Sequence, residues 1–161
     1  MIFVTVGTHE QGFDRLIRSV DEQVGQGFIM DQVVMQSGYS SYIPKNCEYE
    51  QFLSAGQMHQ YIEDADVVIT HGGPASFIDV LRADKIPIVA PRLKKFGEHI
   101  NNHQLTFCQE AYKSGYPIDI VTNFKKIPEL LEEVRGKTFH FKSHNKEFDK
   151  QLSQLVHHLV G

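Results

Sequence analysis

The residues best suited to chemistry lie in a glycine turn between an apolar run and a helix-forming segment. His71, Gly72 and Gly73 follow the apolar residues 67–69, and Pro74 opens the next segment. Glycine lets a backbone approach a ligand closely, and proline suits a first helical turn because no N–H is needed there. The N–H groups and positive dipole end of such a helix favour an anion such as phosphate. The stretch therefore predicts an anion site, although it is neither a Walker loop nor a GxGxxG motif.

Two side chains of this segment are candidates for ligand binding, and each has a structural alternative. His71 could donate to a phosphate oxygen or a sugar hydroxyl, or it could satisfy a local carbonyl. Asp79, in the first turns of the predicted helix, could accept hydrogen bonds from a vicinal diol such as ribose. It could equally pair with Arg82 three residues later. The composition leaves these alternatives open.

Further candidates follow the apolar run at residues 1–6. Gly7 and Thr8 could cradle a diphosphate through backbone N–H groups, or they could form a plain strand-ending turn. His9 and Glu10 have the chemistry of a base or a hydrogen-bonding pair, and His9 is the candidate for a general base.

Polar residues also crowd the segment 98–104. Glu98, Asn102 and Gln104 could face sugar hydroxyls from the start of a helix, or they could belong to a solvated first turn. His99 and His103 have the i,i+4 spacing of some metal ligands. No third ligand has a convincing position, so the sequence predicts no metal site.

The composition limits the class of protein. A chain of 161 residues predicts one domain, and a net charge of -4 without a basic run argues against a nucleic-acid partner. The two cysteines do not form a disulfide framework, and no apolar run approaches the roughly 20 residues of a membrane span. We therefore expect a cytoplasmic protein, or one held at a membrane by something else.

The elements that position these residues alternate along the chain. Strands are predicted at 1–6, 32–36, 48–53, 67–69, 86–90 and 118–121. Helices are predicted at 13–20, 58–62, 75–83, 99–113, 127–134 and, with an amphipathic stripe, 145–160. This alternation indicates an α/β fold, a Rossmann-like, mostly parallel sheet with helices on both faces.

In such sheets the ligand lies beyond the carboxyl ends of the strands. The loops 7–9, 36–38, 71–73 and 91–98 all follow strands, so they are predicted to meet on one rim. Gln36, Gly38 and Pro91 join the candidate site through these loops.

The motif combination resembles the glycosyltransferase family 28 C-terminal domain. The resemblance rests on THGGPASFID at 70–79, KIPIVAPR at 85–92 and NHQ at 102–104. The opening VTVGT at 4–8 and FDRLI at 13–17 are similar to the catalytic subunit of two-part transferases, above all those of bacterial capsule and exopolysaccharide synthesis. The likeness covers about the first three quarters of the chain.

The resemblance implies one half of a GT-B glycosyltransferase, the nucleotide-sugar domain. It implies that Gly7 and Thr8 face the diphosphate and that Gly72, Gly73 and Ser76 form the turn beside it. It further implies that Asp79, in place of the family's usual Glu, contacts the ribose. Asn102 and Gln104 would then face the transferred sugar.

The activity implied is inverting transfer from a UDP-sugar without a metal or other cofactor. Galactose or glucuronic acid would pass to a lipid-linked saccharide. A membrane-anchored subunit would supply the acceptor half, keep this chain at the cytoplasmic membrane surface and provide the base, with His9 as the candidate within the chain. The alternative function is a non-catalytic UDP-sugar-binding or regulatory module.

Overall fold

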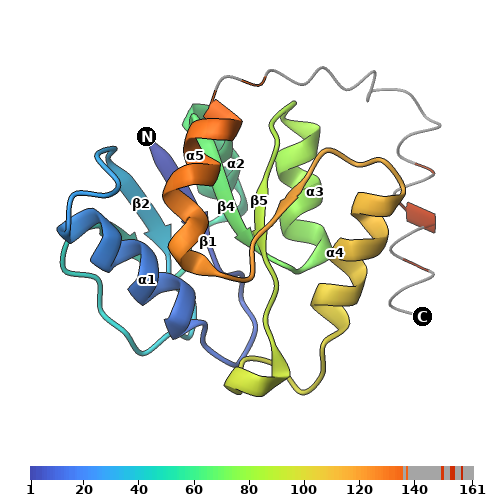
Figure 1. Cartoon of the computed structure of the whole chain (residues 1–161), viewed down its shortest axis with the longest axis horizontal. Helices are drawn as coiled ribbons and strands as arrows, with labels where there is room; N and C mark the ends of the chain where they lie inside the picture. Colours follow the sequence, from blue (N-terminus) through green and yellow to red (C-terminus); the bar gives the residue numbers. More distant parts are fainter. Residues whose placement is uncertain (136, 138–149, 151–152, 155–156, 158–161) are drawn as a thin grey trace.

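The structure, a computed structural model, describes residues 1–135, 137, 150, 153, 154 and 157. Within this part of the chain, six strands form one sheet in the order β3-β2-β1-β4-β5-β6, and all neighbours are parallel (Figure 1). The Rossmann-like parallel sheet predicted from the sequence is therefore confirmed. The amphipathic helix predicted over 145–160 lies almost wholly outside the described residues.

The strands form where apolar and β-branched residues run together. They are β1 (Ile2–Thr5), β2 (Val33–Gln36), β3 (Glu48–Glu50), β4 (Val67–His71), β5 (Ile88–Ala90) and β6 (Asp119–Ile120). β1, β2, β4 and β5 are buried along their whole length. Continuous burial is typical of parallel strands that helices cover on both faces.

Helices connect the strands, except between β2 and β3, where the described chain has no helix, and a further helix follows β6. The helices are α1 (Asp14–Gly25), α2 (Ala55–Asp64), α3 (Pro74–Arg82), α4 (His103–Lys113) and α5 (Ile127–Arg135), with 3₁₀ turns η1 (Lys94–Phe96) and η2 (Phe124–Lys126). α1 and α5 cover one face, while α2 and α3 cover the other with α4 beside α3 (Figure 1). Among the described residues, no helix is both long and apolar enough to cross a membrane.

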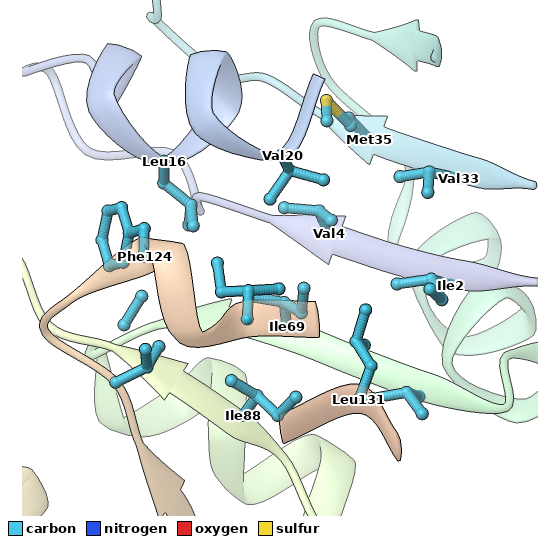
Figure 2. Packing of buried hydrophobic residues seen from close by; sticks show 14 of the residues in the cluster. Ile2, Val4, Leu16, Val20, Val33, Met35, Ile69, Ile88, Phe124 and Leu131 are labelled. Carbon is cyan, nitrogen blue, oxygen red and sulfur yellow. The ribbon is translucent and has the colours of Figure 1, made fainter. Parts of the chain in front are cut away.

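The core is divided between the two faces of the sheet. Ile2 and Val4 of β1 belong to the cluster with Leu16 of α1 and Leu131 of α5 (Figure 2). Phe3, between them, packs on the opposite face with residues of α2 and α3. This period-two alternation places an apolar layer on each side and holds β1 in the centre of the sheet.

Several element boundaries differ from the sequence prediction, two of them in segments next to the predicted rim. The helix expected from residue 99 begins only at His103, because turns occupy 97–102. Gly97 has a φ of 70° and the Asn101 side chain accepts the His103 N–H at 2.9 Å. The strand expected over 48–53 ends at Glu50, since Ser54 already caps α2 through a capping box with Gln57.

The strand order places a crevice between β1 and β4. From β1 the chain runs outward through β2 to β3, and α2 then returns it to β4 on the other side of β1. The connections that leave β1 and β4 therefore diverge to opposite sides. In open α/β sheets, ligands bind at this topological switch point, beyond the carboxyl ends of the strands.

A lysine fixes the end of α2 against the rest of this layer. The Lys85 ammonium donates to the carbonyls of Ile62, Glu63 and Ala65 at 2.5 to 2.6 Å. The last carbonyls of a helix lack intrahelical donors and carry the negative end of its dipole. Lys85 supplies both the missing donors and a positive charge at this helix end. It therefore holds α2 next to the segment between α3 and β5.

Candidate functional site

The loops predicted to meet on one rim do meet there. The Gln36 side chain at the end of β2 donates to the Gly7 carbonyl at 3.1 Å. A Cβ at Gly38 would lie 2.6 Å from that same carbonyl oxygen, and a Cβ at Gly72 would lie 3.0 Å from Cα of Pro91. The ends of β1, β2, β4 and β5 are thus in direct contact, which confirms the convergence.

A pocket of about 430 Å³ opens at the switch point between β1 and β4. We call it the switch-point pocket. Its lining comprises Gly7, Thr8, His9, Gln36, Leu53, Met58, His71, Gly73, Pro74, Ala75 and Ser76. A larger cavity of about 660 Å³ lies between α1 and α5, but it contains none of the strand-end loops. The glycine turns and the start of α3 therefore favour the switch-point pocket as the functional site.

Two glycines enclose the ring of His71. A Cβ on Gly7 or on Gly73 would overlap the imidazole, so only glycine fits at either position. Gly7 also has a φ of 72°, in the left-handed region that other residues rarely adopt. The two loops after β1 and β4 are therefore packed together through one imidazole.

The hydrogen bonds of His71 fix where its proton lies. The Gly73 N–H donates to Nδ1 at 3.1 Å, so Nδ1 carries no proton. Burial and the nearby Arg92 charge lower the pKa of His71 from 6.5 to about 3 and keep the ring neutral. Nε2 therefore carries the proton and donates to Ser76 Oγ at 2.9 Å. The Ser76 hydroxyl hydrogen is then available to a ligand in the pocket.

The start of α3 is suited to an anion. Gly73 is the N-cap, it provides no side-chain cap, and Pro74 occupies the first turn. Pro74 has no N–H, and the N–H groups of Ser76 and Phe77 donate to the Gly73 carbonyl, so within the described residues the N–H of Ala75 is left without an acceptor. The helix dipole makes this end positive. Since Pro74, Ala75 and Ser76 line the pocket, the helix start faces the space where a ligand would sit.

The structure leaves both alternatives for Asp79 open. Asp79 lies one turn after Ser76 on α3, with a side chain that is 62% exposed. It approaches Arg82 to 4.0 Å, the pairing that the sequence offered as its structural alternative. A ribose contact stays a prediction.

The polar residues after β5 form hydrogen bonds or ion pairs with other residues of this chain. Glu98 binds Arg15 through both carboxylate oxygens, at 2.8 and 3.0 Å. The Asn102 side chain accepts the Lys94 N–H at 2.9 Å, and the Gln104 side chain accepts the Arg92 N–H at 3.0 Å. Neither these three residues nor Gly38, Gly72, Asp79 and Pro91 belong to the pocket lining. The sugar contacts expected of Asn102 and Gln104 stay predictions.

Sequence reasoning missed the role of Arg92. In the sequence this arginine only ends the KIPIVAPR stretch at 85–92, yet its side chain is completely buried in the fold. It donates to the carbonyls of Val6, Gln11 and Gly12 at 2.7 to 2.9 Å and packs on the Phe13 ring. Burial lowers its pKa to about 10, so it is charged at neutral pH. The one signal in the sequence is its place two residues after a buried strand.

No group of three His, Cys, Asp or Glu side chains in the described part of the chain is placed to hold a metal ion. His99 and His103, which have metal-ligand spacing in the sequence, do not gather a third ligand there. Whether the reaction needs a metal is a separate question, and metal independence stays a prediction.

The strand order and the pocket at the switch point define a Rossmann-like α/β domain. Comparison with known proteins gives the family. The chain belongs to the glycosyltransferase family 28 C-terminal domain, whose model matches residues 1–159. The resemblance drawn from the sequence motifs is thereby confirmed.

Curated relatives are similar over most of this chain. It is 30% identical over 124 residues to the UDP-N-acetylglucosamine transferase subunit ALG13 of Homo sapiens, covering 71% of this chain and 10% of that protein. It is 33% identical over 116 residues to the subunit of the same name from Candida albicans, covering 70% of this chain and 35% of that protein. The chain therefore spans only a minor part of these relatives' lengths.

Solved structures share the fold at low sequence identity. The kitacinnamycin glycosyltransferase aligns with a TM-score of 0.59 and 18% identity, over 98% of this chain and 38% of its own. The glycosyltransferase SnogD from Streptomyces nogalater aligns with a TM-score of 0.56 and 14% identity, over 99% of this chain and 39% of its own. The chain thus shares its fold with about two fifths of each of these glycosyltransferases.

Proposed function

We propose that this chain is the catalytic, donor-binding subunit of a UDP-sugar-dependent inverting glycosyltransferase. The observation that carries the proposal is the switch-point pocket, where a glycine turn, an uncapped helix start and the Ser76 hydroxyl converge. Family membership supports the same assignment. Backbone dipoles and neutral donors of this kind stabilise a leaving diphosphate as it gains charge.

The residues of the pocket have distinct tasks in this proposal. The diphosphate lies between the loop of Gly7 and Thr8 and the first turn of α3, where the backbone N–H groups of Thr8 and Ala75 are the donors. Ser76 donates its hydroxyl to a phosphate oxygen, and neutral His71 holds that hydroxyl in place. Asp79 accepts hydrogen bonds from the ribose.

The reaction is a single displacement at the anomeric carbon. An acceptor hydroxyl oxygen forms the new bond while the bond from the anomeric carbon to the diphosphate oxygen breaks. The hydroxyl proton passes to a base, UDP leaves with the electron pair, and the configuration inverts. We place the base on the acceptor half, and we propose that no metal is needed because the pocket itself supplies the donors.

A second chain would supply that acceptor half. The relatives of this chain are named as subunits, and the GT-B structures are more than twice as long as the part that matches. We propose a membrane-anchored partner that keeps this chain at the cytoplasmic membrane surface and binds a lipid-linked saccharide. The opening motif favours galactose or glucuronic acid transfer in bacterial capsule or exopolysaccharide synthesis.

Calorimetric titration with UDP tests the binding step, and UDP release tests the transfer. UDP should bind this chain alone, and UDP release from UDP-galactose or UDP-glucuronate should require lipid-linked glucose and the co-expressed acceptor subunit. A flat titration of both the chain and its complex would overturn the proposal.

The alternative is a non-catalytic UDP-sugar-binding module, since the binding residues would be the same. The two functions differ in one measurement. Saturable UDP-sugar binding without UDP release, in the presence of both acceptor and partner, would favour the module. Turnover in the complex that disappears in Ser76→Ala would favour the enzyme, with Ser114→Ala at the end of α4 as a control outside the pocket.

A further inference from the structure

Histidines on the rim share one turn geometry. His9, His71 and His99 each accept, at Nδ1, the backbone N–H of the residue two positions later. The distances are 3.1 Å at His9, 3.1 Å at His71 and 3.4 Å at His99. A backbone N–H can only donate, so Nδ1 carries no proton in any of them. In the neutral ring the proton must therefore lie on Nε2.

The second ring nitrogen of His9, Nε2, is therefore a hydrogen-bond donor. His9 lines the switch-point pocket, and its Nδ1 is held by its own loop. Within the described residues, no group accepts a hydrogen bond from its Nε2. The corresponding proton of His71 is already used on Ser76. His9 thus offers the pocket an N–H with no acceptor in this part of the chain.

The ring of His99 packs against the ring of His9. The two ring centroids are 5.0 Å apart, with the planes tilted by 33°. His9 is exposed while His99 is half-buried in the loop after β5. Burial, helped by the charges of His9 and Arg92, lowers the pKa of His99, which favours an uncharged support at neutral pH. The contact limits how far the His9 ring can turn away from the pocket.

We propose that His9 donates its Nε2–H to the diphosphate of the nucleotide sugar, with His99 as the residue that positions it, and that His9 is not the base of the reaction. The inference rests on the proposed function, because it needs a diphosphate in the switch-point pocket. It replaces the general-base role that the sequence suggested for His9.

The hydrogen-bond geometry argues against the base role. A neutral imidazole acts as a base through its unprotonated nitrogen, which here is Nδ1. That lone pair already accepts the Gln11 N–H. Proton uptake there would break the turn that holds the loop, whereas donation from Nε2 leaves it intact. A developing negative charge on the diphosphate strengthens such a donor bond during the reaction.

Three substitutions separate a donor from a base. The amide nitrogen of Gln reaches the position of Nε2, whereas the shorter Asn reaches only that of Nδ1. We expect His9→Ala and His9→Asn to weaken UDP binding by roughly 10- to 100-fold, the range for a hydrogen bond to a charged group, and His9→Gln to keep it within about threefold. The transfer rate of the complex should follow the same order.

A base would give a different pattern. UDP binding would then be equal in all three variants, and transfer would be lost in all three, including His9→Gln. Equal UDP affinity across the series would overturn the inference while leaving the proposed function in place. If the wild-type chain and its complex bind no UDP, both fail together.

The tautomer and the supporting contact can be measured directly. Nitrogen-15 shifts of the His9 side chain at pH 8 should show the proton on Nε2, and a proton on Nδ1 would overturn the inference. His99→Phe, which keeps an aromatic ring against His9, should retain the UDP affinity that His99→Ala loses. Equal affinity in these two variants would remove His99 from the proposal.

Discussion

The switch-point pocket and the loop after β5 lie on the same rim but use polar groups in opposite ways. No residue that lines the described pocket is Lys or Arg, and the lining offers backbone N–H groups, hydroxyls and imidazole rings as donors. In the β5 loop, Arg92 and Glu98 turn inward and bind the protein itself. Charged side chains therefore stabilise the rim through contacts within the protein, whereas dipolar groups remain available to bind the ligand.

The largest expected effect is that of Arg92→Met. One buried and two partly buried carbonyls would lose their donor, and each unpaired group costs about 1 to 3 kcal/mol, so we expect a stability loss of about 4 kcal/mol. Lys94→Met, in the same loop but exposed, should change stability by less than about 0.5 kcal/mol. Urea unfolding measures both. An Arg92→Met variant as stable as the Lys94 control would show that the arginine is not a brace.

Glu98→Gln tests whether this carboxylate holds the fold or binds a sugar. It keeps the shape but removes the charge that pairs with Arg15, whose side chain is 24% exposed, so we expect a loss of about 2 kcal/mol, below the range for fully buried pairs. UDP affinity should change less than twofold. Glu110→Gln, in an exposed pair with Lys113, is the matched control. A stable Glu98 variant with weakened UDP-sugar binding would reverse the assignment.

The neutral state of His71 predicts a loss of stability in acid. Its pKa is about 3 in the fold against 6.5 in the unfolded chain, so the unfolded chain binds the proton first. Stability is therefore present above pH 6.5 and falls as the pH drops toward 3, by about 2 kcal/mol between pH 7 and 5. Urea midpoints across this range should fall less steeply in His71→Gln. An unchanged slope would mean that His71 is not held neutral.

The smallest expected effect is that of Asp79→Ala. Its pair with Arg82 is long and exposed, so stability should change by less than about 0.5 kcal/mol. If Asp79 contacts the ribose, UDP binding should weaken by roughly 5- to 10-fold, and the preference for UDP over 2′-deoxy-UDP should disappear. Calorimetry with Arg82→Ala as control measures this. An unaltered UDP affinity in Asp79→Ala would leave Asp79 with the pairing role alone.

The sequence carries enough information for the sheet and the pocket because both depend on local patterns. Apolar runs such as 67–69 mark buried strands, and the glycine turn that follows marks the place where a ligand can approach. Parallel topology then gathers the strand ends without any knowledge of side-chain contacts. The rim could therefore be predicted before a single distance was known.

The destination of long polar side chains could not be predicted in this way. Glu98 and Arg15 are 83 residues apart in sequence, and Arg92 binds carbonyls 80 or more residues away. Such pairings are decided by the packed fold, so a charged residue next to a site looks the same in sequence whether it faces a ligand or a carbonyl. The proton position of a histidine likewise depends on one backbone N–H.

The hydrogen bonds of Lys85 make its chemical reactivity a measure of how stably α2, which lines the pocket, is held in place. Its amine is held by carbonyls at the end of α2, the helix whose Met58 lines the pocket. An acylating reagent can modify the amine only when these hydrogen bonds to the carbonyls break. The labelling rate of Lys85, read by mass spectrometry against exposed Lys113, would therefore report how firmly the wall is held and whether a bound nucleotide tightens it.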